Sequence, residues 1–374
     1  MKSPLYVPIV KGKVNDVVAV GKLSRRVRER VKPLVEAMPI NPKNPAIDEH
    51  VHKLCQYIRK HAPLGDLFVD FYGLMPDAQV PDGTNATLFG YQLLKGLGRY
   101  VTPVYGLERN DDLWEPLRTV VAGFGQGFAF RLRRDDLADD LIDETWTTIS
   151  ERSAQLGLVE NDIDIILDFG SLSGLDLAEV KEVVISFLFG NPRARNYRSI
   201  VVASSSALRT VSDVGVDDMA EVVREELHLW SDLWNDLPDE VRPVYGDYGI
   251  VHPDFSDIGP NKYMNAKIRY TAGDKLLYFR GHGLLHPAKD YGQYRGLARK
   301  VRADPRYRTQ TFSFGDEYLN ACANGLGSPG SPSTWVKADM NHHITYVAQQ
   351  IDRLIAAFGM KSSSTSLSSL LAEV

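Results

Sequence analysis

Eight short β-rich runs, each followed by a longer segment of helical periodicity, most constrain the fold of this 374-residue chain. Each run is dominated by Val, Ile, Phe or Tyr, the residues enriched in strands. Several runs are apolar almost throughout, which is typical of parallel strands covered on both faces. The runs begin at Tyr6, Pro33, Leu67, Tyr100, Gly127, Asp162, Arg198 and Val241.

The spacing of these runs predicts a barrel. Successive runs begin 27 to 43 residues apart, which suits one strand, one crossover helix and two loops. Eight consecutive βα units predict an α/β fold of the (β/α)8 TIM-barrel type. An open doubly wound α/β sheet is the alternative, although no G-x-G-x-x-G follows the first run. The helix candidates span 14–31, 47–61, 84–97, 113–123, 137–156, 177–189 and 216–234.

The eighth run is not followed directly by a closing helix. Residues 266–281 predict a β-hairpin that turns at Ala272-Gly273-Asp274, and short helices are expected at 291–301 and 316–324. We therefore expect four parts along the chain. They are a barrel body at 1–255, a hairpin and helical insertion over the barrel mouth at 256–334, a closing helix at 335–360 and a Ser-rich tail at 361–374.

Charge and composition restrict the classes of function. The chain has 43 Lys+Arg against 48 Asp+Glu, which argues against a protein that coats nucleic acid with its whole surface. The N-terminal apolar run is too short for a signal peptide, and no stretch approaches 18 uninterrupted apolar residues. Cys55 and Cys322 are too few for a Cys-type zinc site. We expect a cytoplasmic protein without membrane association; we assign no metal ligand, and the cofactor is unknown.

Function in such a barrel is expected at the C-terminal ends of the strands. Three carboxylates fall there, and we expect Glu36, Asp70 and Asp168 to act as acid–base or metal-positioning groups. The alternative is that they only neutralise Arg131 in a salt-bridge network at the barrel top. A metal-dependent phosphodiesterase is a further possibility, which requires two or three carboxylates and a histidine to converge. The carboxylates could come from Glu36, Asp70, Asp168 and Asp247.

Other polar residues near the strand ends and in the insertion are candidate ligand-binding groups. Ser204 and Ser205 end the seventh run, where many barrels hold a phosphate. His342 and His343 diverge by about 100° on a helix, so they cannot face one metal, and we expect one of them at the barrel mouth. The remaining candidates are Tyr72, Arg131, Asp247, Tyr248, Arg280, His282 and Lys337.

Several short motifs resemble the bacterial and phage "beta family protein" group. They are YVPIVKGK, KPLVE, GDYG after the eighth run, YFRG after the hairpin, and W-x5-NHH in the final helix. The resemblance extends from about Tyr6 to Phe358. It implies a barrel-like fold and genes found among mobile or phage-defence neighbours, but no established activity and no catalytic residue. Val336 stands where the family pattern predicts an arginine, which argues against anion binding by this last motif, at the start of the final helix.

Together these observations predict a barrel protein that binds an anionic ligand at the C-terminal face of its strands. The ligand is expected to be a phosphate-containing small molecule or a nucleic-acid end; hydrolysis of it and a role in phage defence are left open. The alternative is a non-catalytic recognition or scaffold subunit of a defence or toxin-type assembly with a protein partner. Some of the 17 Tyr, 14 Phe and 5 Trp would then line an interface.

Overall fold

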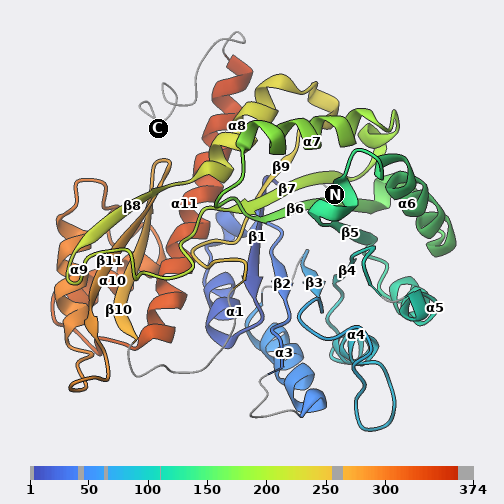
Figure 1. Ribbon diagram of the computed structural model, residues 1–374. Coiled ribbons are helices and arrows are strands. Elements are labelled where there is room, and N and C mark those ends of the chain that lie inside the picture. The colour runs from blue at the N-terminus through green and yellow to red at the C-terminus, as the bar shows by residue number, and fades with distance from the viewer. Residues whose placement is uncertain (1–3, 41–45, 63–65, 110, 255–263, 361–374) are drawn as a thin grey trace.

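A computed structural model describes residues 4–40, 46–62, 66–109, 111–254 and 264–360. Its central feature is a closed barrel of eight parallel strands, ordered β1-β2-β3-β4-β5-β6-β7-β9 (Figure 1). Because β9 pairs with β1, the sheet has no edge, and the (β/α)8 prediction is confirmed over the open sheet. The strands are β1 (Tyr6–Lys11), β2 (Leu34–Glu36), β3 (Phe68–Asp70), β4 (Thr102–Tyr105), β5 (Phe128–Leu132), β6 (Ile163–Ser171), β7 (Ser199–Ser205) and β9 (Val244–Asp247).

The expected crossover helices are present, with one break. The segment 14–31 forms two helices, because Ser24 caps a new helix by accepting a hydrogen bond from the backbone N–H of Val27. The helices around the barrel are α1 (Val14–Gly21), α2 (Arg25–Arg28), α3 (Ile47–His61), α4 (Ala86–Gly96), α5 (Trp114–Ala122), α6 (Ile142–Leu156), α7 (Leu177–Phe189) and α8 (Glu225–Asp236). Short 3-10 turns are η1 (Asp111–Leu113), η2 (Arg134–Leu137), η3 (Glu160–Asp162), η4 (Ala194–Asn196) and η5 (Asp239–Val241).

A second unit, the extension, is built on an antiparallel sheet ordered β10-β11-β8. The predicted hairpin is present, but the helix expected at 216–234 is wrong in its first half. Met219–Val223 instead forms β8, which pairs with β11 over five register positions. The elements of the extension are β8, β10 (Asn265–Ala272), β11 (Lys275–Gly283), α9 (Gln293–Ala303) and α10 (Phe314–Ala323).

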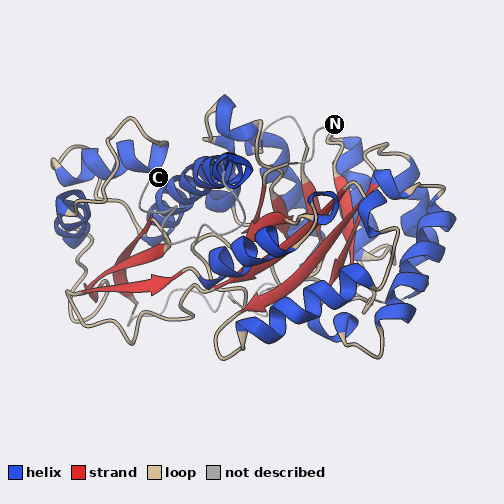
Figure 2. Cartoon of the chain, turned by 90° about the horizontal axis from the view of Figure 1, so that it is seen from above, coloured by secondary structure: helices blue, strands red, loops and turns tan. Residues whose placement is uncertain are grey.

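Helix α11 (Pro332–Met360) joins the two units. It packs on β10 and α10 at one end and on α1 and β1 of the barrel. In Figures 1 and 2 the described part of the extension lies beside the barrel along α11, and the expected cover over the mouth stays a prediction. The residues expected to link the barrel to the hairpin, 255–263, and the tail, 361–374, lie outside the described residues.

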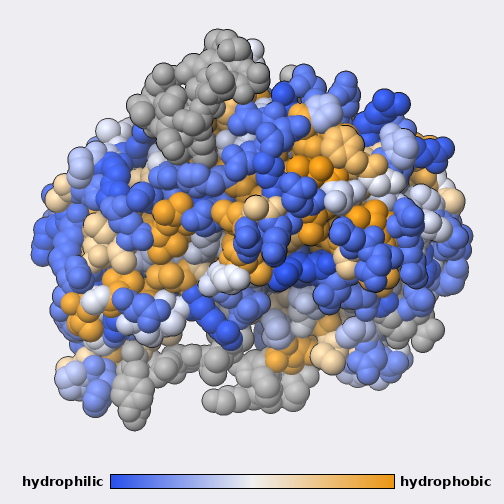
Figure 3. Space-filling model, turned by 45° about the horizontal axis from the view of Figure 1, so that its top comes forward, coloured by the Kyte–Doolittle hydropathy of each residue, from blue (hydrophilic) through white to orange (hydrophobic). Residues whose placement is uncertain are grey.

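Most large apolar side chains are buried in the two units. Inside the barrel, Ile9, Leu34, Phe68 and Ile166 form an apolar filling, and a larger layer packs between strands and helices. The extension has its own core around Trp335. On the face shown in Figure 3, hydrophobic patches are interrupted by hydrophilic residues. In the described part of the chain, every helix is too short or too polar to cross a membrane.

Candidate functional site at the barrel mouth

A layer of charged side chains lies above the apolar filling of the barrel. Alternate residues of a strand point to the same face, so the residue two positions after an inward apolar side chain also points inward. In five strands that residue is charged. The pairs are Ile9 and Lys11, Leu34 and Glu36, Phe68 and Asp70, Ala129 and Arg131, and Ile166 and Asp168.

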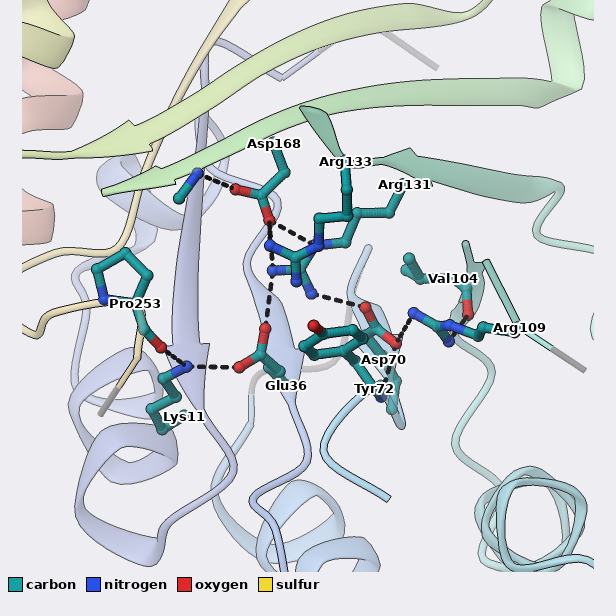
Figure 4. A network of polar contacts seen from close by, with 12 residues as sticks. Lys11, Glu36, Asp70, Tyr72, Val104, Arg109, Arg131, Arg133, Asp168 and Pro253 are labelled. Atoms are coloured by element: carbon teal, nitrogen blue, oxygen red, sulfur yellow. Dashed lines mark hydrogen bonds and ion pairs between the residues drawn. The ribbon is translucent and has the colours of Figure 1, made fainter. Parts of the chain in front are cut away.

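Arg131 lies at the centre of this layer (Figure 4). Its Nη2 is 2.7 Å from Oε2 of Glu36, and its Nη1 is 2.7 Å from Oδ2 of Asp70. Its Nε donates to Oδ2 of Asp168 at 2.8 Å. The Tyr248 hydroxyl donates to the same oxygen at 2.6 Å and accepts from Nη2 of Arg131 at 2.9 Å. The structure therefore brings Glu36, Asp70, Arg131, Asp168 and Tyr248 together in the salt-bridge network that was the alternative expectation, and their catalytic and binding roles stay predictions.

Each of the three carboxylates also contacts a second cation. We call the four cations, the three carboxylates and Tyr248 the mouth network. The second contacts are Lys11 to Glu36 at 2.5 Å, Arg109 to Asp70 at 2.7 Å and Arg133 to Asp168 at 2.7 Å. A fourth carboxylate, Glu108, lies 3.6 Å from Nε of Arg109, so the four cations face four carboxylates in all. Sequence reasoning missed Lys11 and Arg109; the two-residue alternation after Ile9 would have revealed Lys11, whereas Arg109 lies in a loop without periodicity.

Burial and charge act in opposite directions on the carboxylates. Asp70 and Asp168 are fully buried, which by itself would raise their pKa values. The neighbouring Arg109 and Arg131 at Asp70, and Arg131 and Arg133 at Asp168, lower both pKa values below the ordinary range. Both carboxylates are therefore ionised near neutral pH and can accept a proton or a hydrogen bond but not donate a proton.

The rim of the network is open to solvent. The Tyr72 side chain is 45% exposed, and the Arg133 guanidinium lies 4.4 Å from the centre of its ring. The Arg133 side chain itself is 24% exposed. Of the four cations, Arg133 is therefore the one best placed to meet a ligand, beside an aromatic ring.

Three strands end in the same kind of turn. Oδ1 of Asp70, Asp168 and Asp247 each accepts a hydrogen bond at 2.9 Å from the backbone N–H two residues later. After Asp168 and Asp247 that residue is a glycine with φ of +63° and +62°, a conformation that side chains rarely adopt. The Asp-aromatic pair at each strand end was a signal available in the sequence.

Asp247 and the paired histidines do not join the mouth network. Asp247 and Tyr248 are adjacent in the chain and point to opposite faces. Asp247 therefore lies outside the barrel, where it accepts from Tyr6 at 2.6 Å and contacts Nε2 of His343 at 2.9 Å. Nδ1 of His343 is 2.7 Å from Oγ1 of Thr271. Burial lowers the pKa of His343 despite the neighbouring Asp247.

His342 lies within the extension. It contacts Asp316 at 2.8 Å and its ring stacks on Tyr270. The expectation that one of the paired histidines faces the barrel mouth is therefore wrong, because α11 packs between the two units and buries both rings.

The remaining predicted residues have local partners. Arg280 donates to the carbonyls of Val211 and Ser212, and His282 lies between two aspartates of the extension. Lys337 lies over the ring of Phe314. Ser204 and Ser205 are buried, and Oγ of Ser205 accepts from the backbone N–H of Ala207. Arg280, His282 and Lys337 thus do not gather with the mouth network, whereas the binding role of the two serines stays a prediction.

The carboxylates do not form the cluster that a metal-dependent phosphodiesterase requires. Asp247 is separated from the mouth network, as described above. Across residues 4–360, leaving out the undescribed gaps, no group of three or more His, Cys, Asp or Glu is placed to hold a metal ion.

A second charged cluster, which sequence reasoning missed, lies at the opposite end of the barrel. Asp164, near the start of β6, contacts Lys32 at 3.2 Å and Arg198 at 2.6 Å, and Ser199 donates to it at 2.6 Å. Residues at this end of a (β/α)8 barrel serve stability rather than chemistry. The mouth network is thus the candidate functional site.

Comparison with known proteins assigns the family. The family model described as "Beta protein" matches residues 6–349. The chain belongs to this family. The match confirms the resemblance seen in the motifs of the sequence, and the closed barrel is therefore a fold found in the Beta protein family.

Two solved structures are similar in part. A crystal structure of AsfvAP:AG is 12% identical, with a TM-score of 0.28 over 55% of this chain and 75% of the other. Alanine racemase from Clostridium difficile 630, in complex with cycloserine, is 11% identical, with a TM-score of 0.34 over 73% of this chain and 61% of the other. Neither likeness bears on function at these values, and no curated protein matches the sequence.

Proposed function

We propose that this Beta protein family member binds an anionic, phosphate-containing ligand at the barrel mouth. The observation that supports the proposal is the partly exposed Arg133 at the rim, whose guanidinium lies 4.4 Å from the centre of the exposed Tyr72 ring. Arg133 contacts only Asp168 among the three network carboxylates, so its guanidinium can also donate to an incoming anion. A guanidinium is suited to phosphate, and the exposed Tyr72 ring offers a surface for a planar or sugar group.

The proposal is one of binding and does not include hydrolysis. Each carboxylate of the mouth network is held by two cations, and the lowered pKa values of Asp70 and Asp168 remove a proton donor near neutral pH. The expected role in phage defence rests on the resemblance to the family and stays a prediction.

The scaffold alternative has less support. Exposed large aromatic side chains in the described part of the chain are Tyr72, Tyr100 and Phe189, which belong to three different segments. A protein-binding surface would be expected to gather such residues in one patch.

The test is a melting-temperature series with AMP, ribose 5-phosphate, pyrophosphate and uncharged ribose. A ligand that binds only the folded state raises Tm with concentration, by about 2.7 kcal/mol of added stability at a hundred times its Kd. We expect a rise with the phosphate compounds and none with ribose. Arg133→Ala should abolish the rise, whereas Arg134→Ala, the exposed neighbour, should keep it.

A rise that is equal in Arg133→Ala and wild type would contradict this site. A flat series in all proteins would favour the scaffold alternative, and affinity capture of a partner would follow.

A further inference from the structure

A second site lies away from the barrel mouth, in a groove of about 740 Å³ where the two units meet. We call it the α11 groove. Its walls come from three segments: the junction of α1 and α2, the chain leading into α10, and the face of α11 between them (Figure 1). The lining residues that matter below are Lys22, Phe312, Phe314 and Glu317. None of its lining residues belongs to the mouth network.

One cation, Lys22, lines the groove, and two more, Lys337 and Arg308, lie over its lining rings without lining it themselves. The ammonium groups of Lys22 and Lys337, from the barrel side and from α11, each lie 5.5 Å from the centre of the Phe314 ring. The Arg308 guanidinium lies 4.9 Å from the Phe312 ring and 5.9 Å from Tyr346. Within the described residues, no acidic side chain forms an ion pair with any of these three cations. They are held by rings alone and are available to a negatively charged ligand.

The charge of both walls differs from that of the whole molecule. The segment 22–30 contains five Lys or Arg residues and one Glu, and residues 264–360 contain 13 Lys or Arg against 7 Asp or Glu. The whole chain has 43 against 48, so the rest of the molecule is strongly acidic. Such an asymmetry directs a polyanion to the groove and away from other surfaces.

We propose that the α11 groove binds single-stranded nucleic acid. Phosphates would contact Lys22 within the groove and Lys337 and Arg308 beside it, and bases would pack against the half-buried rings of Phe312 and Phe314. Proteins use this combination to hold single strands without regard to sequence. An acidic peptide would satisfy the cations but would leave the rings without a planar partner. Glu317 would repel an anion at one side of the groove and so restrict the path of the strand.

The experiment is fluorescence anisotropy with a fluorescein-labelled 12-mer of dT and its RNA counterpart, at 50 and 200 mM NaCl. Three phosphate contacts predict that binding weakens by about twentyfold between the two salt concentrations. The Lys22→Ala/Arg308→Ala double variant should bind about tenfold or more weakly. A matched double variant on the barrel surface, Lys53→Ala/Arg118→Ala, should bind as wild type does, because both residues lie outside the groove.

Two further measurements, with a ring variant and with an acidic competitor, test the role of the rings and the kind of ligand. Phe314→Leu should weaken binding of the oligonucleotide, and a polyglutamate 12-mer should not compete with it. No binding at 50 mM NaCl, full binding by the double variant, or equal competition by polyglutamate would each overturn the proposal. If the double variant does not fold, Lys22→Ala alone, an exposed position, answers the same question.

Discussion

Arg131 holds the mouth network together, because its guanidinium contacts all three carboxylates at once. Replacing it by methionine removes a fully buried charge and leaves the carboxylates facing one another. We expect Arg131→Met to lower the free energy of unfolding by about 3 kcal/mol, the range found when one partner of a buried ion pair is removed. Urea unfolding at pH 7 measures this. Arg134→Met, at the exposed neighbour, should change it by less than about 0.5 kcal/mol.

The pH dependence of the free energy of unfolding gives a second test of the role of Arg131. The folded-state pKa values of Asp70 and Asp168 lie below the unfolded value of about 3.9, so their contribution is complete above that pH and is lost as the pH falls through the folded-state values. Without Arg131, burial raises both values. We therefore expect the variant to gain more stability than wild type from pH 7 to pH 5, because Asp70 and Asp168 would add to groups such as Asp16 that already titrate there in wild type. A parallel pH profile for the two proteins would contradict the network.

The pKa of Asp16 is shifted in the opposite direction to those of Asp70 and Asp168. It is buried in the first turn of α1, and burial raises its pKa to about 6. The unfolded chain loses this proton near pH 4, so the folded state becomes less stable as the pH rises from about 4 to about 6. We expect Asp16→Asn to be more stable than wild type by about 2 kcal/mol at pH 7.5 and equal to it at pH 4. Urea unfolding at both pH values tests this, and a difference that is independent of pH would refute it.

At the scale of elements, the loops after β2 and β3 approach each other closely. A Cβ on Gly73 would lie 2.0 Å from the carbonyl oxygen of Ala37, which is backbone and cannot rotate away. We expect Gly73→Ala to separate the strand ends that carry Glu36 and Asp70 and to lower the free energy of unfolding by about 1–3 kcal/mol.

Gly96 is the matched control for Gly73. It ends α4, is exposed and has no neighbour within 4 Å of an added Cβ. Alanine there should raise stability by about 0.5–1 kcal/mol, since it restricts the unfolded chain. Chemical unfolding of both variants compares them, and equal effects would mean that the close approach at Gly73 does not matter.

Elements with a strong local pattern could be predicted closely from the sequence. The bounds expected for α3 and α7 agree with the structure, because their apolar residues recur with helical periodicity. The helix predicted at 216–234 is wrong in its first half because Met219–Val223 forms a strand by pairing with β11, more than fifty residues away in the chain. No local pattern carries that information.

At the scale of the whole molecule, the two units are interlocked. β8 lies between β7 and α8 in the chain but belongs to the sheet of the extension, and α11 runs from the core around Trp335 to the barrel core at Val347. Neither unit can unfold without breaking the other. We expect one calorimetric transition with equal calorimetric and van't Hoff enthalpies. Two resolved transitions would show that the units are independent.

The sequence by itself determined the barrel and the composition of the layer at its mouth. Strand periodicity is a local property, and the residues two positions beyond an apolar inward side chain share its face wherever the strand lies. Only the tertiary structure decided that Arg109 completes the mouth network, that Asp247 turns outward to His343, and that β8 joins the extension. These features depend on which strands and helices become neighbours in space. Contacts between distant parts of the chain determine that, and no single segment encodes it.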